Sequence, residues 1–172
     1  MKKSIKKIIG KLYKNNIQED VFIKKYEKEK DRTVDEEYIK SLIQRGINNK
    51  DANDIEEAIV LIYSGNFDNH VYVKELCNIL LESWHFKHED IVRILHELQD
   101  ISTIDCLYKV AGSKFEYLDY DDTYQLARKS IKALSAIASE EAINKISLLS
   151  NSSNAIIAGY AKKELQNNQL NQ

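Results

Sequence analysis

Hydrophobic residues recur at helical spacing along almost the whole chain. The first stripe places Ile5, Ile8, Ile9 and Leu12 at positions i, i+3, i+4 and i+7, with lysines between them. The same spacing recurs in further segments joined by short polar turns. These segments are residues 17–30, 33–46, 54–64, 69–84, 88–99, 103–111, 122–138, 140–150 and 154–167. The pattern predicts an all-α protein of about ten helices.

Composition agrees with helices. The 172 residues include no proline and only five glycines, whereas the many tight turns of an all-β protein need both.

Thr33 followed by Glu36 has the spacing of a capping box, and Gly46 suits the residue just after a helix. We therefore expect the third helix to begin at Thr33 and end at Gly46.

The helices show an internal repeat. An offset of 39 residues aligns Leu95 with Leu134, and four further apolar positions between 98 and 110 then fall on apolar positions between 137 and 149. A further offset of 31 residues places Leu165 on Leu134. We expect these three leucines to occupy equivalent buried positions in successive helix pairs.

Residues 126–165, LARKSIKALSAIASEEAINKISLLSNSSNAIIAGYAKKEL, resemble two consecutive HEAT-like repeats. Each unit has a helix ending in an alanine-leucine pair, a short turn and a second helix with small and aliphatic residues. The resemblance implies a right-handed solenoid of short helix pairs, because one pair cannot bury its apolar face alone. We expect one domain over 1–172, with basic cap helices at 1–49, repeats at 50–168 and a polar tail at 169–172.

Charge is distributed unevenly. Residues 1–50 hold 14 Lys and Arg against 8 Asp and Glu, whereas residues 51–172 hold 11 against 19. The acidic remainder favours a cationic partner and disfavours nucleic acid. The lysine-rich first helix suits a solvated cap, with an anionic membrane or RNA surface as the alternative.

No apolar run approaches the length of a membrane span, and no secretory signal is recognisable, so we expect no membrane partner. Cys77 and Cys106 fall within predicted helices. We expect them to be reduced thiols in a cytoplasmic protein.

Catalytic motifs are absent. The sequence has no glycine-rich phosphate loop, CxxC pair, HExxH or GxSxG, so we expect no enzyme and no cofactor. Histidines gather at His85, His88 and His96, but eight helical residues separate the last two by about 12 Å, too far for one metal ion. We expect no metal site and interpret these histidines as surface or inter-helix residues.

Trp84 ends the predicted helix at 69–84. Packing in the core or between repeats is one interpretation, and a binding anchor is the other. As an anchor it forms, with His88, a secondary candidate for partner binding.

The insertion SKFEYLDYDD, residues 113–122, accounts for the longer repeat spacing. Tyrosines are frequent energetic anchors at interfaces, and carboxylates steer a cationic partner. The partner-binding candidates are Glu116, Tyr117, Asp119, Tyr120, Asp121, Asp122 and Tyr124. In the alternative interpretation, Phe115 and Leu118 hold the loop on the core while the acids cap the helix that begins near Asp122.

Small HEAT-like proteins of this kind resemble the immunity proteins of bacterial contact-dependent inhibition and other polymorphic toxin systems. The resemblance implies a monomeric, non-catalytic protein that binds a cationic toxin, such as a nuclease. Two alternatives stay open. One is a HEAT-like DNA-binding protein of alkylated-base repair, and the other is a HEAT-like adaptor or chaperone.

Overall fold

The computed structural model describes the backbone of residues 1–170 and the side chains of residues 1–168. Over this range the chain forms ten α-helices and three short 3-10 helices, with no β-strand, as the periodicity predicts. The predicted polar tail at 169–172 lies outside the described side chains. Contacts divide the chain into two compact units, Met1–Val71 and Tyr72–Gln172.

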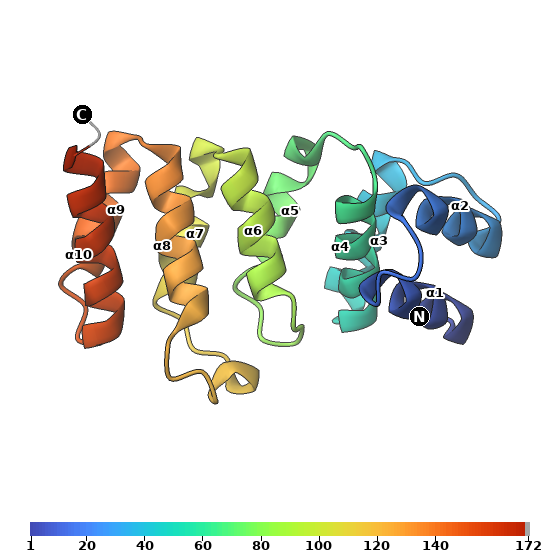
Figure 1. Ribbon diagram of the computed structural model, residues 1–172, viewed down its shortest axis with the longest axis horizontal. Coiled ribbons are helices and arrows are strands. Elements are labelled where there is room, and N and C mark those ends of the chain that lie inside the picture. Colours follow the sequence, from blue (N-terminus) through green and yellow to red (C-terminus); the bar gives the residue numbers. More distant parts are fainter. Residues whose placement is uncertain (171–172) are drawn as a thin grey trace. The chain divides into compact units, whose positions relative to one another are not determined.

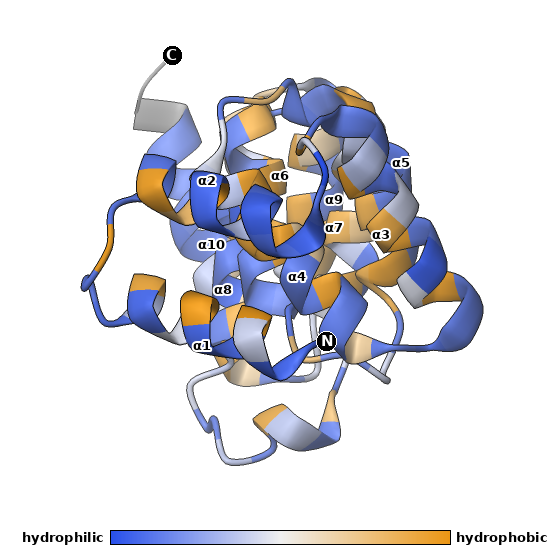
Figure 2. Cartoon of the chain, turned by 90° about the vertical axis from the view of Figure 1, so that its right-hand side faces the viewer, coloured by the Kyte–Doolittle hydropathy of each residue, from blue (hydrophilic) through white to orange (hydrophobic). Residues whose placement is uncertain are grey.

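The first unit contains four helices. They are α1 (Lys3–Tyr13), α2 (Glu19–Lys30), α3 (Glu36–Asn49) and α4 (Ala52–Ser64). Helix α1 packs against α2, and α4 packs against both α2 and α3. Each of these helices mixes hydrophobic and hydrophilic residues (Figure 2). The hydrophobic stripe of α1 faces inward, since Ile5 and Ile9 are 0% and 4% exposed.

Two predictions about α3 are wrong. Its N-cap is Asp35, whose carboxylate accepts the backbone N–H of Tyr38 at 2.8 Å, and the helix runs past Gly46 to Asn49. Gly46 is buried inside the helix because α4 crosses there. A Cβ at this position would lie 2.6 Å from Cδ1 of Ile55. The glycine therefore permits close helix packing and does not end the helix.

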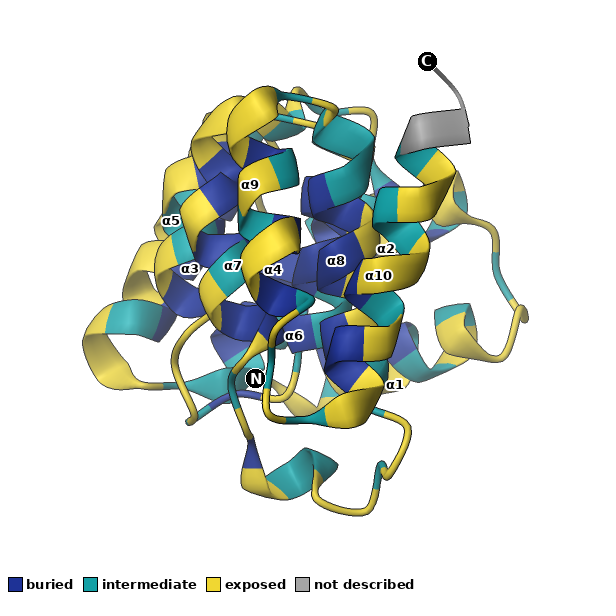
Figure 3. Ribbon diagram, turned by 90° about the vertical axis from the view of Figure 1, so that its left-hand side faces the viewer, coloured by how far each residue is buried: buried dark blue, intermediate teal, exposed yellow. Residues whose placement is uncertain are grey.

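The second unit contains six α-helices. They are α5 (Val73–Ile79), α6 (His88–Leu98), α7 (Ile104–Ala111), α8 (Gln125–Ile137), α9 (Glu140–Leu149) and α10 (Ala155–Leu170). Helices α6, α8 and α10 lie side by side in one layer, and α5, α7 and α9 form the layer behind (Figure 1). Buried residues of α8, α9 and α10 lie where the helices meet, and exposed residues cover the outer sides (Figure 3).

The repeat register agrees with this layering in two of three positions. Leu95 on α6 and Leu134 on α8 are both 0% exposed. Leu165 on α10 is half-buried, so the expected equivalence fails at the last helix. The reason is that α8 packs closely against α6, α7, α9 and α10, whereas the close packing of α10 is with α8 and α9.

The predicted helix over 69–84 is shorter. A 3-10 turn, η1 (Asn69–Tyr72), precedes α5, which ends at Ile79, so Trp84 and His85 lie in the following loop.

The expectation of reduced thiols is also wrong. Cys77 on α5 and Cys106 on α7 form a disulfide with a Cα–Cα distance of 5.5 Å, because these two helices pack side by side.

Candidate functional site

The insertion leaves the end of α7 and returns to the start of α8. In Figure 1 it projects beyond the helix ends, beside the loop that leads into α6. It contains one 3-10 turn, η3 (Glu116–Leu118). Phe115, which precedes the turn, is only 5% exposed and so fixes the insertion on the unit. The predicted anchoring role of Phe115 is therefore confirmed, whereas Leu118 is only half-buried.

Phe115 packs against a buried pair of histidines. His85 and His88 are both 0% exposed, and their rings stack with centroids 4.2 Å apart. The Phe115 centroid lies 3.7 Å from that of His88. We call these three residues the histidine stack. It joins the loop after α5, the first turn of α6 and the insertion.

Hydrogen bonds define the protonation of both rings. Nε2 of His85 lies 2.6 Å from the carbonyl of Ile79, and Nε2 of His88 lies 2.9 Å from the carbonyl of Glu82. A carbonyl can only accept, so each Nε2 carries the hydrogen. Nδ1 of His85 accepts the backbone N–H of Lys87 at 3.1 Å. His85 is therefore the neutral Nε2–H tautomer.

Burial keeps both rings neutral. Burial and, to a lesser extent, the neighbouring His85 together lower the pKa of His88 to about 4, against an opposite effect of the hydrogen bond to the Glu82 carbonyl. Burial also lowers the pKa of His85. At pH 7 the stack therefore carries no charge.

The insertion brings Tyr117 onto the stack. Its hydroxyl lies 2.8 Å from Nδ1 of His88, and its ring meets the Phe86 ring edge-on at a centroid distance of 5.2 Å. Burial raises the pKa of Tyr117 to about 12, and the charges of Glu89 and Asp90 act in the same direction. The hydroxyl therefore keeps its hydrogen at neutral pH.

An aromatic edge lies outside the stack. We define it as Trp84, Phe86 and Tyr117. Phe86 is 63% exposed, Tyr117 is half-buried, and half-buried Trp84 donates its indole N–H to the Glu82 carboxylate at 2.9 Å. Trp84 is thus absent from the buried core because α5 ends five residues earlier, so the core part of the packing interpretation is wrong. Its ring still packs edge-on against His85, at a centroid distance of 5.3 Å.

The predicted carboxylates have different roles. Asp121 accepts from the backbone N–H groups of Thr123 at 3.0 Å and Gln125 at 2.6 Å, and these bonds lower its pKa together with the Thr123 hydroxyl, whose bond is the largest cause. Gln125 begins α8, so Asp121 is the helix-capping acid that the alternative interpretation expects. Glu116, Asp119 and Asp122 are exposed.

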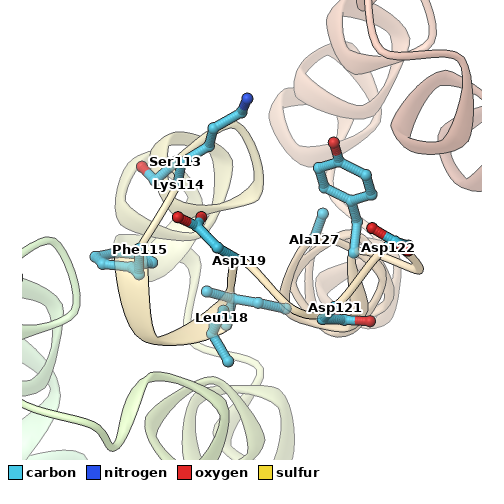
Figure 4. Close-up of a pocket in the computed structure, with 10 residues that line it drawn as sticks. Ser113, Lys114, Phe115, Leu118, Asp119, Asp121, Asp122 and Ala127 are labelled. Atoms are coloured by element: carbon cyan, nitrogen blue, oxygen red, sulfur yellow. The ribbon is translucent and has the colours of Figure 1, made fainter.

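Behind the insertion lies a cavity of about 150 Å³. Asp119 and Asp122 approach it from opposite sides, whereas Lys114 extends away from it (Figure 4). Tyr124 lines the same cavity and has left-handed backbone geometry, with φ 53°. Tyr120 is 82% exposed. The structure therefore separates the predicted residues into the aromatic edge, where Tyr117 contacts His88 and Trp84 contacts His85, and the acidic cavity.

Sequence reasoning missed Phe86 and Glu82. Phe86 is a large apolar residue in the polar loop between α5 and α6, and this position was the available signal. No sequence signal identifies Glu82, because its backbone carbonyl accepts from His88 and only the folded turn brings its carboxylate to the Trp84 indole.

Among the described residues, no three His, Cys, Asp or Glu side chains converge to hold a metal ion. Both ring nitrogens of His85 and of His88 are already engaged in hydrogen bonds. His96 lies two turns further along α6 and is half-buried.

No described helix is long and apolar enough to cross a bilayer.

No protein-family model, curated protein or solved structure matches the chain.

Proposed function

We propose that the protein is a non-catalytic binding protein, an immunity protein that neutralises a cognate toxin by direct contact. The observation that carries this proposal is the aromatic edge, which presents large side chains to solvent on a buried, hydrogen-bonded support. Fixed aromatic side chains are typical of interface hot spots, because they lose little entropy on binding.

Charge supports a cationic partner, such as a nuclease. Residues 82–90 and 113–122 together hold seven Asp and Glu against two Lys. The rest of the chain is nearly balanced, so the acidic character is local to the candidate site. A local acidic rim raises the association rate with a basic protein and suits the cover of a nucleic-acid-binding surface.

We further propose that the helix pairs form a right-handed HEAT-like solenoid and that the free protein is a monomer. The buried positions of Leu95 and Leu134 and the two helix layers of the second unit support the repeat. The proposed location is the cytoplasm. The Cys77–Cys106 disulfide weighs against it, because structural disulfides persist mainly in oxidising compartments.

Growth protection tests this function. The C-terminal domain of whatever protein the reading frame directly upstream encodes is expressed from an inducible promoter, with and without the present chain. We expect growth arrest alone and growth in the presence of the protein. A variant with Phe86→Ala and Tyr117→Ala should lose protection, and Leu148→Ala, which removes a 57% exposed side chain on α9, should keep it. Continued arrest with both proteins folded and expressed contradicts the proposal.

Nucleic-acid binding is a second candidate function, favoured by one observation. A groove of about 280 Å³ between α8 and α10 is lined by Arg128, Lys132 and Lys163, together with Tyr160, Glu164 and Asn167. Cations beside a tyrosine and a carboxylate are what a HEAT-like DNA-repair protein needs in its groove. Fluorescence anisotropy with labelled duplex DNA tests it. Binding that Arg128→Glu abolishes supports this function, and no binding at low salt excludes it.

A further inference from the structure

We propose that the aromatic edge receives an arginine side chain of the partner, because His88 leaves the Tyr117 hydroxyl able to accept hydrogen bonds but not to donate one. This inference rests on the proposed function, since it names the chemical group that the same site recognises. It makes His88 a positioning residue, buried and out of reach of the partner.

The first step is the direction of one hydrogen bond. Nε2 of His88 lies 2.9 Å from the Glu82 carbonyl, which cannot donate, so Nε2 carries the hydrogen of the neutral ring. Nδ1 is then a bare acceptor. The Tyr117 hydroxyl lies 2.8 Å from Nδ1, and it must therefore donate its only hydrogen to His88.

The second step is what remains on the Tyr117 oxygen. The backbone N–H of His88 also acts on this oxygen through a hydrogen bond, which lowers the pKa of Tyr117 against the larger effect of burial. A hydroxyl has two acceptor positions and one hydrogen. One acceptor position is left, and any further bond must be donated by the partner.

The other polar groups of the edge add no free donor. The Trp84 indole N–H is bonded to the Glu82 carboxylate at 2.9 Å. The ammonium of Lys87 is not part of the edge, and its side chain, 18% exposed, is directed to Asp90 at 3.5 Å. A carboxylate or phosphate of the partner has only acceptor oxygens, and at the edge it would face the acceptor oxygen of Tyr117. Two acceptors cannot form a hydrogen bond, so this contact would be unfavourable.

Electrostatics favours a cation at the same place. After burial, the charges of Glu89 and Asp90 act to raise the pKa of Tyr117, so each makes the potential at its hydroxyl more negative. Both carboxylates are also ion-paired, Glu89 with Lys129 at 2.5 Å and Asp90 with Lys87 at 3.5 Å, and these cations offset part of that potential. Glu116 lies one residue away in the insertion and is exposed. A positive N–H donor satisfies both the free acceptor position and this potential.

Ring geometry favours arginine over lysine. The Phe86 and Tyr117 rings meet at 85°, and Phe86 is 63% exposed, so the two rings form a corner open to solvent. A planar guanidinium can stack on one face and direct an N–H toward the hydroxyl. A lysine ammonium has the charge but no plane to stack.

Short capped peptides provide the probes. Hexaarginine, hexalysine and hexaglutamate are titrated into the whole protein at low salt, with affinity measured by calorimetry. We expect hexaarginine to bind more tightly than hexalysine, and hexaglutamate not to bind. Tyr117→Phe should weaken hexaarginine about tenfold, which corresponds to one hydrogen bond to a charged group. Tyr108→Phe, on α7, is the matched control and should leave affinity unchanged.

Two His88 variants separate positioning from general structure. His88→Gln keeps a donor for Glu82 and an acceptor for Tyr117, so it should preserve the preference for arginine. His88→Leu removes both groups and should reduce the preference for hexaarginine over hexaglutamate. Nitrogen chemical shifts of His88 report the tautomer without any partner. A ring protonated at Nδ1, or an effect of Tyr117→Phe equal to that of Tyr108→Phe, overturns the inference.

The failure of this inference and the failure of the proposed function can be told apart. Hexaarginine affinity that Tyr117→Phe leaves unchanged, together with growth protection by the wild-type protein, overturns the arginine contact and leaves the immunity function standing. Hexaarginine binding that depends on Tyr117, without growth protection by the wild-type protein, supports the acceptor site and contradicts the immunity function.

Discussion

The hydroxyl of Tyr160 donates to the backbone carbonyl of Thr123 at 2.8 Å, across 37 residues of sequence. Tyr160 lies on α10, so the last helix holds the end of the insertion while Phe115 holds its beginning. The segment between these two attachments contains the exposed Tyr120 and the exposed carboxylates. The insertion is therefore a loop attached at both ends. Its acids differ in role, because Asp121 accepts the backbone N–H of Gln125 whereas Asp122 is exposed.

Asp121 should matter for folding, and its neighbour Asp122 should not. Asp121→Ala leaves the N–H of Gln125 at the start of α8 without its acceptor and should lower the melting temperature by a few degrees. Asp122→Ala removes an exposed side chain and should leave the melting temperature unchanged. Melting followed by circular dichroism measures both, and equal effects would contradict the assigned cap.

Leu134 should be a central core residue of the second unit. It is 0% exposed on α8, so Leu134→Ala should lower the free energy of unfolding by about 2–5 kcal/mol. Leu148→Ala on α9 is the control, and its change should stay within about 0.5 kcal/mol. Urea denaturation gives both values. A small effect at Leu134 would show that α8 is not packed as described.

Acid should destabilise the protein through His88. Its pKa is about 4 in the folded chain, below the ordinary histidine value of about 6.5. Between these values the unfolded chain takes up a proton that the folded chain does not. The free energy of unfolding should therefore fall as the pH falls through this window, by up to roughly 3 kcal/mol.

Urea denaturation between pH 7.5 and pH 4.5 measures this dependence, with His88→Gln as the comparison. The variant should show a shallower fall, although lowering of the His85 pKa by burial leaves part of the slope. Identical slopes in the two proteins would place the acid sensitivity elsewhere.

Reduction should destabilise the second unit. The disulfide joins residues 29 positions apart, and a loop of this length stabilises a fold by about 3–4 kcal/mol through the unfolded state. Dithiothreitol should lower the melting temperature of the wild-type protein and leave a Cys77→Ser, Cys106→Ser variant unaffected. Equal responses, or free thiols in the untreated protein, would contradict the bond.

Local patterns predicted what depends on neighbours in sequence. Hydrophobic spacing identified the helices, the offset between Leu95 and Leu134 identified repeated positions, and the longer spacing identified the insertion. The site prediction also contained Tyr117, Trp84 and His88, which the structure brings into one region. It could not join them, because the bond between Tyr117 and His88 spans 29 residues.

The failures share one physical cause, which is contact between segments distant in sequence. Gly46 has the properties of a helix end, yet the crossing of α4 decides its role. Cys77 and Cys106 pair because α5 lies on α7, a fact that no local spacing contains. Leu165 is only half-buried, because no described helix of its unit follows α10 to cover it.

The disulfide encloses residues 77–106 in a covalent ring that contains the loop of Trp84, Phe86 and His88 and the whole of α6. A peptide bond cut inside this ring cannot release either fragment while the sulfurs stay joined. Chymotrypsin would cut after Tyr120, 82% exposed and outside the ring, and after Phe86, 63% exposed and inside it, and a cut after Phe86 alone leaves a nicked chain that the disulfide holds together. The nicked chain would migrate as one species on a non-reducing gel and as two after reduction, so a cut at the most exposed ring of the aromatic edge would not release that part of the chain.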